Sequence, residues 1–493
     1  MVSTPHPMSS RKADRIFLGV VVAYFTIQTL LRTFLGGSFE VDEAEMIAMA
    51  RDFRLGYGPQ LPLYNWFQTA AFKLFGFNTF ALTVTKNFLL CLTYAGAYLG
   101  LRQKLPIRLS LLGTMGLLLL PNLSFEGQRA GSHSIAMYAA MAWTLYILLR
   151  QWRAPDFGNW IALGLCLALG GLSKYNYWLF PLTLFLTAYW HKDLRRTLWR
   201  RELLISLAIA AAFVAIPYGW IATHMDQALS STQKFYHTSS GSSLSPRQQG
   251  VVEFFIQSLV AILLTLLSLL VAWLPSRKAL RRVAEDQGIG LWLIRAGALG
   301  LVISLIGVIA SGSSDVQARW LLPALIPLST GLMLWIGTAL SARAGRNLLR
   351  FCAVLPLILI AAMADIRLRG AGSDSLMVEV LADHIEDACP DGPIAIDAPG
   401  YYYLGNLRYY HPNWFTPSTA TIHLIPESVR CFVLVETADL TRVETLLQNY
   451  SVPASRLQGP SKAYTATLPY RFEDPDVTRD VPYIIIPLKN GAP

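Results

Sequence analysis

The sequence predicts an α-helical protein that crosses the membrane many times and ends in a small α/β domain. Three observations lead to this fold class. Hydrophobic residues make up 53% of the 493 residues and charged residues only 15%. The mean hydropathy of +0.40 is high for a soluble chain of this length. The apolar residues gather in eleven long runs, and the composition changes after the last of them.

A transmembrane helix needs about 20 mostly apolar residues, so the helices are placed by apolar runs and by the Lys and Arg residues between them. The runs are 16–35, 79–101, 105–121, 134–149, 159–173, 176–190, 203–221, 251–274, 288–310, 320–340 and 348–364. Every even-numbered run is followed by basic residues, such as Arg277, Lys278, Arg281 and Arg282 after the eighth. Because cytoplasmic loops are enriched in basic residues, the amino terminus is expected inside the cell. Outer loops are then expected at 36–78, 122–133, 222–250 and 311–319.

The first apolar run is longer than a signal-peptide core and is not followed by a clear cleavage site, so it is expected to be a retained anchor. Residues 1–364 then form a transmembrane domain and residues 365–493 a separate domain on the outer face. In that domain, helical periodicity is found at 375–389 and 439–450, and short β-type runs at 394–398, 431–435 and 483–486.

The cysteines and aromatic residues of the outer domain have two interpretations each. Cys389 and Cys431 could form a disulfide or remain two free thiols, because spacing alone does not decide pairing. Six aromatic residues could bind sugars, but a small domain also needs rings for its core, and we favour the core. They are Tyr401, Tyr402, Tyr403, Tyr409, Tyr410 and Trp414. Cys91, Cys166 and Cys352 are expected to be small core residues.

The net charge of +10 does not indicate a nucleic-acid partner, because the basic residues lie between apolar runs and form no long tract with interleaved aromatics. The sequence contains no Walker A loop, HExxH, CxxC or dinucleotide-binding glycine motif. Nucleotide hydrolysis and a Cys-ligated zinc site therefore have no support. No cofactor is predicted, the need for a divalent metal stays open, and the sequence does not predict an oligomeric state.

Residues 39–66 place an acidic cluster directly after the first apolar run. Asp42, Glu43 and Glu45 are followed by apolar residues at helical spacing, which predicts a short helix lying on the membrane surface. Asp42, with Glu45 three residues later, also fits a helix N-cap in a capping box. Glycine and proline then interrupt the pattern, so 60–66 is expected to return irregularly toward the bilayer. Carboxylates beside lipid are costly and therefore indicate a functional site.

Two further outer segments carry polar side chains. The loop at 122–134 holds Glu126, Gln128, Arg129 and His133, which suggests a site, although a solvated Glu126–Arg129 pair is the alternative. Lys174 and Arg319 stand at the outer ends of apolar runs, where a cation can also be a simple interfacial anchor. Cations and carboxylates on one membrane face suit a lipid-linked substrate that carries phosphate.

Five segments of the chain form a recognisable set: the Asp42-Glu43 pair, ARDF at 50–53, GYGPQLPLYNW at 56–66, GGLSKYNY at 170–177 and RWLLPALIP at 319–327. Together they resemble the GT-C glycosyltransferases that use polyprenyl-phosphate sugars, a family that includes protein O-mannosyltransferases and aminoarabinose or galacturonic acid transferases of lipid A. The GYGPQ segment and the His133-Ser134 pair look most like the rhizobial-type lipid A and core galacturonosyltransferases.

The resemblance implies an inverting transfer with Asp42 near the acceptor nucleophile, and Glu43 and Glu126 are the other candidate catalytic carboxylates. The candidate substrate contacts are Tyr57, Gln60, Tyr64, Gln128, Arg129, His133, Lys174, Tyr175 and Arg319. The chain departs from the family pattern at two places. Gln60-Leu61-Pro62 stands where aminoarabinose transferases carry Lys-Pro, and Glu126 and His133 stand where the second loop commonly supplies another Asp.

The expected protein is a bacterial inner-membrane enzyme with its active site and outer domain in the periplasm. Its partners would be a polyprenyl-phosphate sugar donor, a lipid A or core saccharide acceptor and membrane lipids. Transfer to protein serine or threonine is an alternative. A lipid or glycan transporter without chemistry is another, although the repeated halves typical of transporters are not evident.

Overall fold

The computed structural model describes residues 7–50, 52–230, 244–274, 287–390, 392–419 and 424–489. Several sequence features lie outside the described residues. They are Arg51 of the ARDF segment, residues 231–243 of the expected fourth outer loop, and the basic residues Arg277, Lys278, Arg281 and Arg282.

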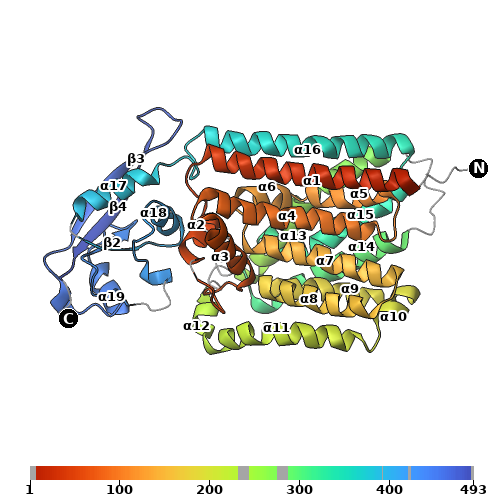
Figure 1. Cartoon of the computed structure of the whole chain (residues 1–493), viewed down its shortest axis with the longest axis horizontal. Coiled ribbons are helices and arrows are strands. Elements are labelled where there is room, and N and C mark those ends of the chain that lie inside the picture. The colour runs from red at the N-terminus through yellow and green to blue at the C-terminus, as the bar shows by residue number, and fades with distance from the viewer. Residues whose placement is uncertain are drawn as a thin grey trace, which may run out of the picture. The chain divides into compact units, whose positions relative to one another are not determined.

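Helices dominate the chain up to residue 368, and four strands follow (Figure 1). The helices of this part are α1 (Pro7–Leu35), α2 (Val41–Met49), α3 (Leu63–Phe75), α4 (Thr79–Leu101), α5 (Ile107–Leu118), α6 (Pro121–Arg129), α7 (His133–Arg153), α8 (Phe157–Ser173), η1 (Tyr175–Trp178), α9 (Leu179–Ala188), α10 (Lys192–Leu198), α11 (Leu203–Thr223), α12 (Met225–Ala228), α13 (Pro246–Trp273), α14 (Gln287–Ser311), α15 (Ala318–Ala339) and α16 (Ala342–Leu368). The remaining elements are α17 (Val378–Ala388), β1 (Ile394–Asp397), α18 (Tyr402–Tyr410), η4 (Pro417–Thr419), β2 (Cys431–Val435), α19 (Arg442–Asn449), η5 (Ala454–Arg456), β3 (Lys462–Pro469) and β4 (Thr478–Pro487).

The chain divides into two compact units. The first unit consists of residues 1–28, 54–64 and 86–360, and the second of residues 29–53, 65–85 and 361–493. The second unit therefore combines the C-terminal domain with the acidic segment and with parts of α1, α3, α4 and α16. The sequence-based boundary between residues 364 and 365 stays a prediction. The acidic segment, however, belongs to the same unit as residues 361–493 and not to the unit that contains most of the helix bundle.

The first unit is a bundle of apolar helices in which α8 packs between α7 and α11, and α14 packs along α15 (Figure 1). Among the described residues, seven helices of the whole chain are long and apolar enough to cross a membrane. They are α1, α4, α11, α13, α14, α15 and α16, and the bent pair α5 and α6 makes an eighth if it counts as one span. The protein is thus a multi-pass membrane protein, and the count of eleven spans stays a prediction.

Two segments expected to be irregular are largely helical. Helix α3 begins at Leu63, so the second half of the 60–66 segment is helix. The expected loop at 122–134 contains α6 and the start of α7. Pro121 stands in the first turn of α6, where its missing N–H costs no hydrogen bond, and this start signal is visible in the sequence.

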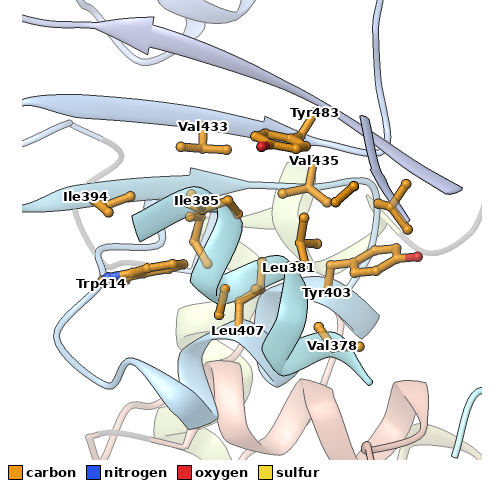
Figure 2. Packing of buried hydrophobic residues seen from close by; sticks show 14 of the residues in the cluster. Val378, Leu381, Ile385, Ile394, Tyr403, Leu407, Trp414, Val433, Val435 and Tyr483 are labelled. Carbon is orange, nitrogen blue, oxygen red and sulfur yellow. The ribbon is translucent and has the colours of Figure 1, made fainter. Parts of the chain in front are cut away.

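The C-terminal part of the second unit is a four-stranded sheet with the order β1-β2-β4-β3. Strands β1 and β2 are parallel, and the other two pairs are antiparallel. The side chains alternate along each strand, so Ile394 and Ile396 face the core beneath α17 and α18, whereas Ala395 faces the core beneath α19. Figure 2 shows the first of these cores, where Leu381, Leu407 and Val433 converge.

The expected elements at 375–389, 394–398, 431–435, 439–450 and 483–486 are all present. Strand β3 and helix α18 are not predicted from the sequence, because most of β3 is exposed and α18 is rich in tyrosine. Four of the six aromatic residues serve the core as favoured: Tyr403 and Trp414 are buried in it, and Tyr402 and Tyr410 pack against it. Tyr409 instead packs against Phe39, and Tyr401 is not part of this core. Cys389 and Cys431 form a disulfide with a Cα–Cα distance of 6.1 Å, which joins the end of α17 to the start of β2.

Candidate functional site

The acidic helix α2 lies in the second unit, and its first turn carries Asp42 and Glu43. The expected capping box is wrong: the N-cap residue is Glu40, so Asp42 lies inside the first turn, where the helix dipole favours a negative charge. The expected position on the membrane surface is also wrong for most of the helix. Met46 and Met49 are buried inside the protein, as are Glu43 and Glu45. Of the three carboxylates, only that of Asp42 is half-buried.

Glu43 belongs to a buried ion cluster, which consists of Arg32, Glu40, Glu43, Arg367 and Asp374. Its Oε2 lies 3.0 Å from Nη2 of Arg32 and 3.9 Å from Nη2 of Arg367. Arg367 also lies 3.2 Å from Asp374, and Ser373 donates a hydrogen bond of 2.7 Å to Glu40. Buried charges are tolerated when they are paired in this way. The carboxylate of Glu43 therefore links α2 to the ends of α1 and α16, and its catalytic role stays a prediction.

Among the described residues, the members of the ion cluster are three carboxyl groups and two guanidinium groups. Burial raises the pKa of Asp374 to about 6, because desolvation and the nearby Glu40 and Glu43 outweigh the favourable charge of Arg367. Asp374 thus keeps its proton to a higher pH than an ordinary aspartate does.

Helix α18 of the C-terminal domain packs directly against α2. The side-chain amide of Asn406 accepts a hydrogen bond from the N–H of Phe39 at 2.8 Å and donates one to its carbonyl at 3.0 Å. Gly405 lies so close to α2 that a Cβ atom there would be 2.2 Å from the carbonyl oxygen of Ala44. Arg408 donates to the carbonyl of Ala48 near the other end of α2. This α2–α18 interface fixes α2 along its whole length.

The GYGPQ segment belongs to the first unit and is held closely there. Tyr57 and Gln60 form an isolated antiparallel bridge, and the hydroxyl of Tyr57 accepts a hydrogen bond from the N–H of Arg54 at 3.0 Å. At Gly56 a Cβ atom would fall 1.9 Å from the ring of Trp220, so a side chain does not fit there. Tyr57 is buried and Gln60 half-buried, which makes Gln60 the more accessible of these two candidate contacts.

The structure brings several candidate substrate contacts together around Lys174. The ammonium group of Lys174 donates a hydrogen bond of 2.7 Å to Ser134, and the ring of the neighbouring His133 lies 5.6 Å from the ring of Tyr64. Asn176 donates to the carbonyl of Trp320 at 3.0 Å, which ties the 174–178 turn to the start of α15, where Arg319 stands. Tyr175 is 42% exposed beside this turn.

Helix α6 places its candidate residues on two faces: Glu126 and Arg129 are partly exposed, whereas Gln128 is buried. Glu126 and Arg129 form an i,i+3 ion pair at 3.2 Å with exposed fractions of 42% and 33%, so solvent screens much of it. Gln128 is buried and donates to Asn87 of α4 at 3.0 Å. Its carbonyl accepts a hydrogen bond of 2.7 Å from Lys86, whose side chain is 2% exposed.

Lys86 and Asn87 are not among the sequence-predicted site residues, because the 79–101 run is apolar overall. A lysine inside such a run is itself the signal, since ionisable residues within membrane helices usually mark a functional or tightly paired position.

The candidate residues thus fall into two groups. Asp42 and Glu43 belong to the second unit, and the other ten belong to the first: Tyr57, Gln60, Tyr64, Glu126, Gln128, Arg129, His133, Lys174, Tyr175 and Arg319. In the described part of the chain, no group of three or more His, Cys, Asp or Glu side chains is placed to hold a metal ion.

These features define a class of protein: a polytopic membrane protein with the fold of ArnT. The crystal structure of ArnT from Cupriavidus metallidurans in the apo state matches with a TM-score of 0.60 and 14% identity, over 95% of this chain and 98% of that one. The structure of ArnT bound to undecaprenyl phosphate matches with a TM-score of 0.62 and 13% identity over the same shares. The fold class predicted from the sequence is confirmed.

Sequence comparison gives more particular relatives. Residues 58–220 match the family model described as dolichyl-phosphate-mannose-protein mannosyltransferase. Over 361 residues, the chain is 28% identical to the lipopolysaccharide core galacturonosyltransferase RgtB of Rhizobium johnstonii, covering 72% of each chain. Over 410 residues, it is 29% identical to the core galacturonosyltransferase RgtA of the same organism, covering 80% of each. The resemblance that the sequence motifs indicated is confirmed.

Proposed function

We propose that this protein is an inverting glycosyltransferase that moves a sugar from a polyprenyl phosphate to lipid A or to the core oligosaccharide of lipopolysaccharide. Galacturonic acid is the sugar we propose. The observation that carries this proposal is the similarity to two core galacturonosyltransferases over 72% and 80% of both chains. The ArnT fold, which has been solved with undecaprenyl phosphate bound, supports the class of donor.

Asp42 is the proposed catalytic base. As the new glycosidic bond forms, the acceptor hydroxyl gives its proton to the Asp42 carboxylate, and the bond from the anomeric carbon to the polyprenyl phosphate breaks. Two features support this choice: its neighbour Glu43 is already paired with arginine, and Asp42 is the half-buried carboxylate of a helix that is fixed along its length. If the acceptor is a phosphate, no base is needed and Asp42 orients the nucleophile.

Lys174 and Arg319 are proposed to hold the phosphate of the donor, because cations at the headgroup level neutralise phosphate charge. The hydrogen bond from Asn176 to Trp320 supports this pairing, since it links the segments that carry the two cations. The proposed substrate contacts near these two cations are Tyr57, Gln60, Tyr64, Tyr175, Gln128, Arg129 and His133. If Asp42 is not the base, Glu126 is the alternative.

The proposed location is the bacterial inner membrane, with the amino terminus in the cytoplasm and the active site and C-terminal domain in the periplasm. The basic residues after the even-numbered apolar runs support this orientation. A reporter fused after Gly370 tests it: a reporter that works only in the periplasm should be active there, and cytoplasmic activity contradicts the orientation.

A second candidate function is transfer to protein serine or threonine. The observation that favours it is the description of the family model matched by residues 58–220, which names a protein mannosyltransferase.

Mass spectrometry of lipid A and core saccharide, from cells with and without the gene, distinguishes the candidates. We expect the two samples to differ by one hexuronic acid residue, and a plasmid carrying the intact gene should restore the difference. A different sugar mass would correct the donor. Unchanged lipid A and core with a lost protein glycan would favour protein transfer, and no change in any envelope glycan would favour a transporter.

A further inference from the structure

The C-terminal sheet carries a pocket that none of the candidate site residues lines. Its volume is about 310 Å³. Its polar lining consists of Arg430, Gln458, Lys462 and Tyr464, and the Cys389–Cys431 disulfide forms part of its wall. Pockets that bind small molecules have volumes from about 300 Å³ upward, so this one suits one or two sugar units rather than a long chain.

The walls of the pocket belong to well-packed elements. Lys462 and Tyr464 are two residues apart on β3 and therefore point to the same face of the sheet. Tyr464 lies opposite Tyr483 of β4, and the two rings stack with their centroids 5.5 Å apart. The disulfide fixes the end of α17 to the start of β2 beside Arg430. The sheet thus holds Lys462 and Tyr464, and the backbone N–H groups of Arg430 and Gln458 donate hydrogen bonds to the carbonyls of Pro393 and Pro487.

The chemistry of the lining fits an acidic sugar. In the described part of the chain, neither Arg430 nor Lys462 forms an ion pair with a carboxylate, so both charges are available to a ligand. Guanidinium and ammonium groups bind carboxylates through charge-assisted hydrogen bonds. An aromatic ring such as that of Tyr464 offers an apolar face to the C–H side of a sugar ring, and the amide of Gln458 can bond hydroxyl groups.

We propose that this pocket binds a uronic acid residue of the saccharide substrate or product. The inference rests on the proposed function, in which the saccharide gains galacturonic acid. None of the pocket residues belongs to the α2–α18 interface or to the buried ion cluster, so the pocket is a separate saccharide-binding site. It would hold a uronate-bearing branch of the acceptor while another part of the saccharide reacts.

Isothermal titration of the full-length protein in detergent tests this proposal, with digalacturonate as the probe. Neutral digalactose and inorganic phosphate are the comparison ligands. We expect digalacturonate to bind, digalactose to bind at least tenfold more weakly, and Arg430→Gln and Lys462→Gln each to weaken digalacturonate binding about tenfold. Lys489→Gln, an exposed cation that does not line the pocket, should leave binding unchanged.

Three results would overturn the proposal: no binding of digalacturonate, equal binding of digalactose, or binding that Arg430→Gln and Lys462→Gln leave unchanged. Phosphate binding as tight as digalacturonate binding would overturn the uronate assignment and identify a phosphate site. Because the titration requires no sugar transfer, it also separates the two proposals. Lost binding contradicts the pocket assignment alone, whereas unchanged core and lipid A masses in cells without the gene contradict the proposed function.

Discussion

The side chain of Asn406 makes hydrogen bonds to both the N–H and the carbonyl of Phe39, two residues before the helix that carries Asp42. The two residues are separated by 367 positions in the sequence. Together with Gly405 against Ala44 and Arg408 on Ala48, this contact makes the C-terminal domain part of the support of α2. The domain thus contacts the acidic helix at several points and is expected to support its geometry.

Asn406→Ala should destabilise the protein and reduce its activity. Asn406 is fully buried, and its removal takes a partner from both backbone groups of Phe39. Each buried polar group left without a partner costs about 1–3 kcal/mol. Thermal unfolding in detergent measures the loss, and Asn449→Ala on the exposed side of α19 is the control. A melting temperature equal to that of the parent would show that the contact is dispensable.

Glu43→Ala should be among the most destabilising changes in the second unit. It leaves the buried Arg32 and Arg367 without their shared carboxylate, and breaking one side of a buried ion pair costs about 3–5 kcal/mol. Replacing both Arg32 and Glu43 with apolar residues should recover much of that loss. The exposed pair Arg369–Asp365 provides the control, because Asp365→Ala should leave the melting temperature unchanged. Full stability of Glu43→Ala would argue against a structural role.

Asp374 should make stability depend on pH between about 4 and about 6. In the unfolded chain this carboxyl group titrates near 3.8, whereas in the folded protein its pKa is raised to about 6. As pH rises through this window the unfolded state loses its proton first, so the folded state becomes less stable. Below the window both states are protonated and Asp374 contributes nothing.

The measurement is the difference in melting temperature between the parent and Asp374→Asn across this pH range. The difference should move in favour of Asp374→Asn as pH rises and should become constant above about pH 6. Asp383→Asn, at an exposed position of α17, should show no such trend. A constant difference from pH 4 to pH 7 would mean that Asp374 titrates normally.

Lys174→Ala and Arg319→Ala should each raise the donor concentration required for half-maximal rate by about ten- to a hundredfold, since a charge-assisted contact contributes roughly 1.5–3 kcal/mol. Ser134→Ala should have a smaller effect, because it removes only the hydrogen bond that orients Lys174. Lys192→Ala on α10 is the control cation. If the donor concentration for half-maximal rate is unchanged in both alanine variants, Lys174 and Arg319 do not bind the donor phosphate and are interfacial anchors.

The sequence was informative where a local pattern sets the structure. The apolar runs locate most of the long helices, and periodicity locates three of the four strands and α17. The catalytic role of Asp42 stays a prediction. The predicted start of α2 is wrong because the Asp42–Glu45 spacing imitates a capping box. The N-cap residue is Glu40, whose side chain accepts a hydrogen bond from Ser373, more than 300 residues away in the sequence. Arg367 and Asn406 were missed for the same reason: their roles depend on contacts with the amino-terminal segment, and no local pattern encodes those contacts.

The role of Asp42 can now be tested without the complication of a cap. Asp42 lies in the first turn of α2, so Asp42→Asn should cost at most about 1 kcal/mol through the lost interaction with the helix dipole. Catalysis by a general base requires more. A positioned carboxylate that takes the acceptor proton contributes about 10²–10⁴ in rate, and an amide cannot take it. We therefore expect Asp42→Asn to melt like the parent while turnover falls at least a hundredfold.

Three other carboxylates serve as matched controls for Asp42: Glu43 and Glu45 of the same helix, and Glu126 of α6. Glu45→Gln should lose less turnover than Asp42→Asn, and Glu43→Gln should lose turnover only in proportion to its lost stability, because Glu43 is bound to Arg32. Glu126→Gln should change little while Asp42 serves as base. Near-normal turnover of Asp42→Asn would exclude Asp42 as the base. If Glu126→Gln then abolished turnover, Glu126 would be the base that takes the acceptor proton. Its carboxylate is 42% exposed, and its ion-pair partner among the described residues is Arg129.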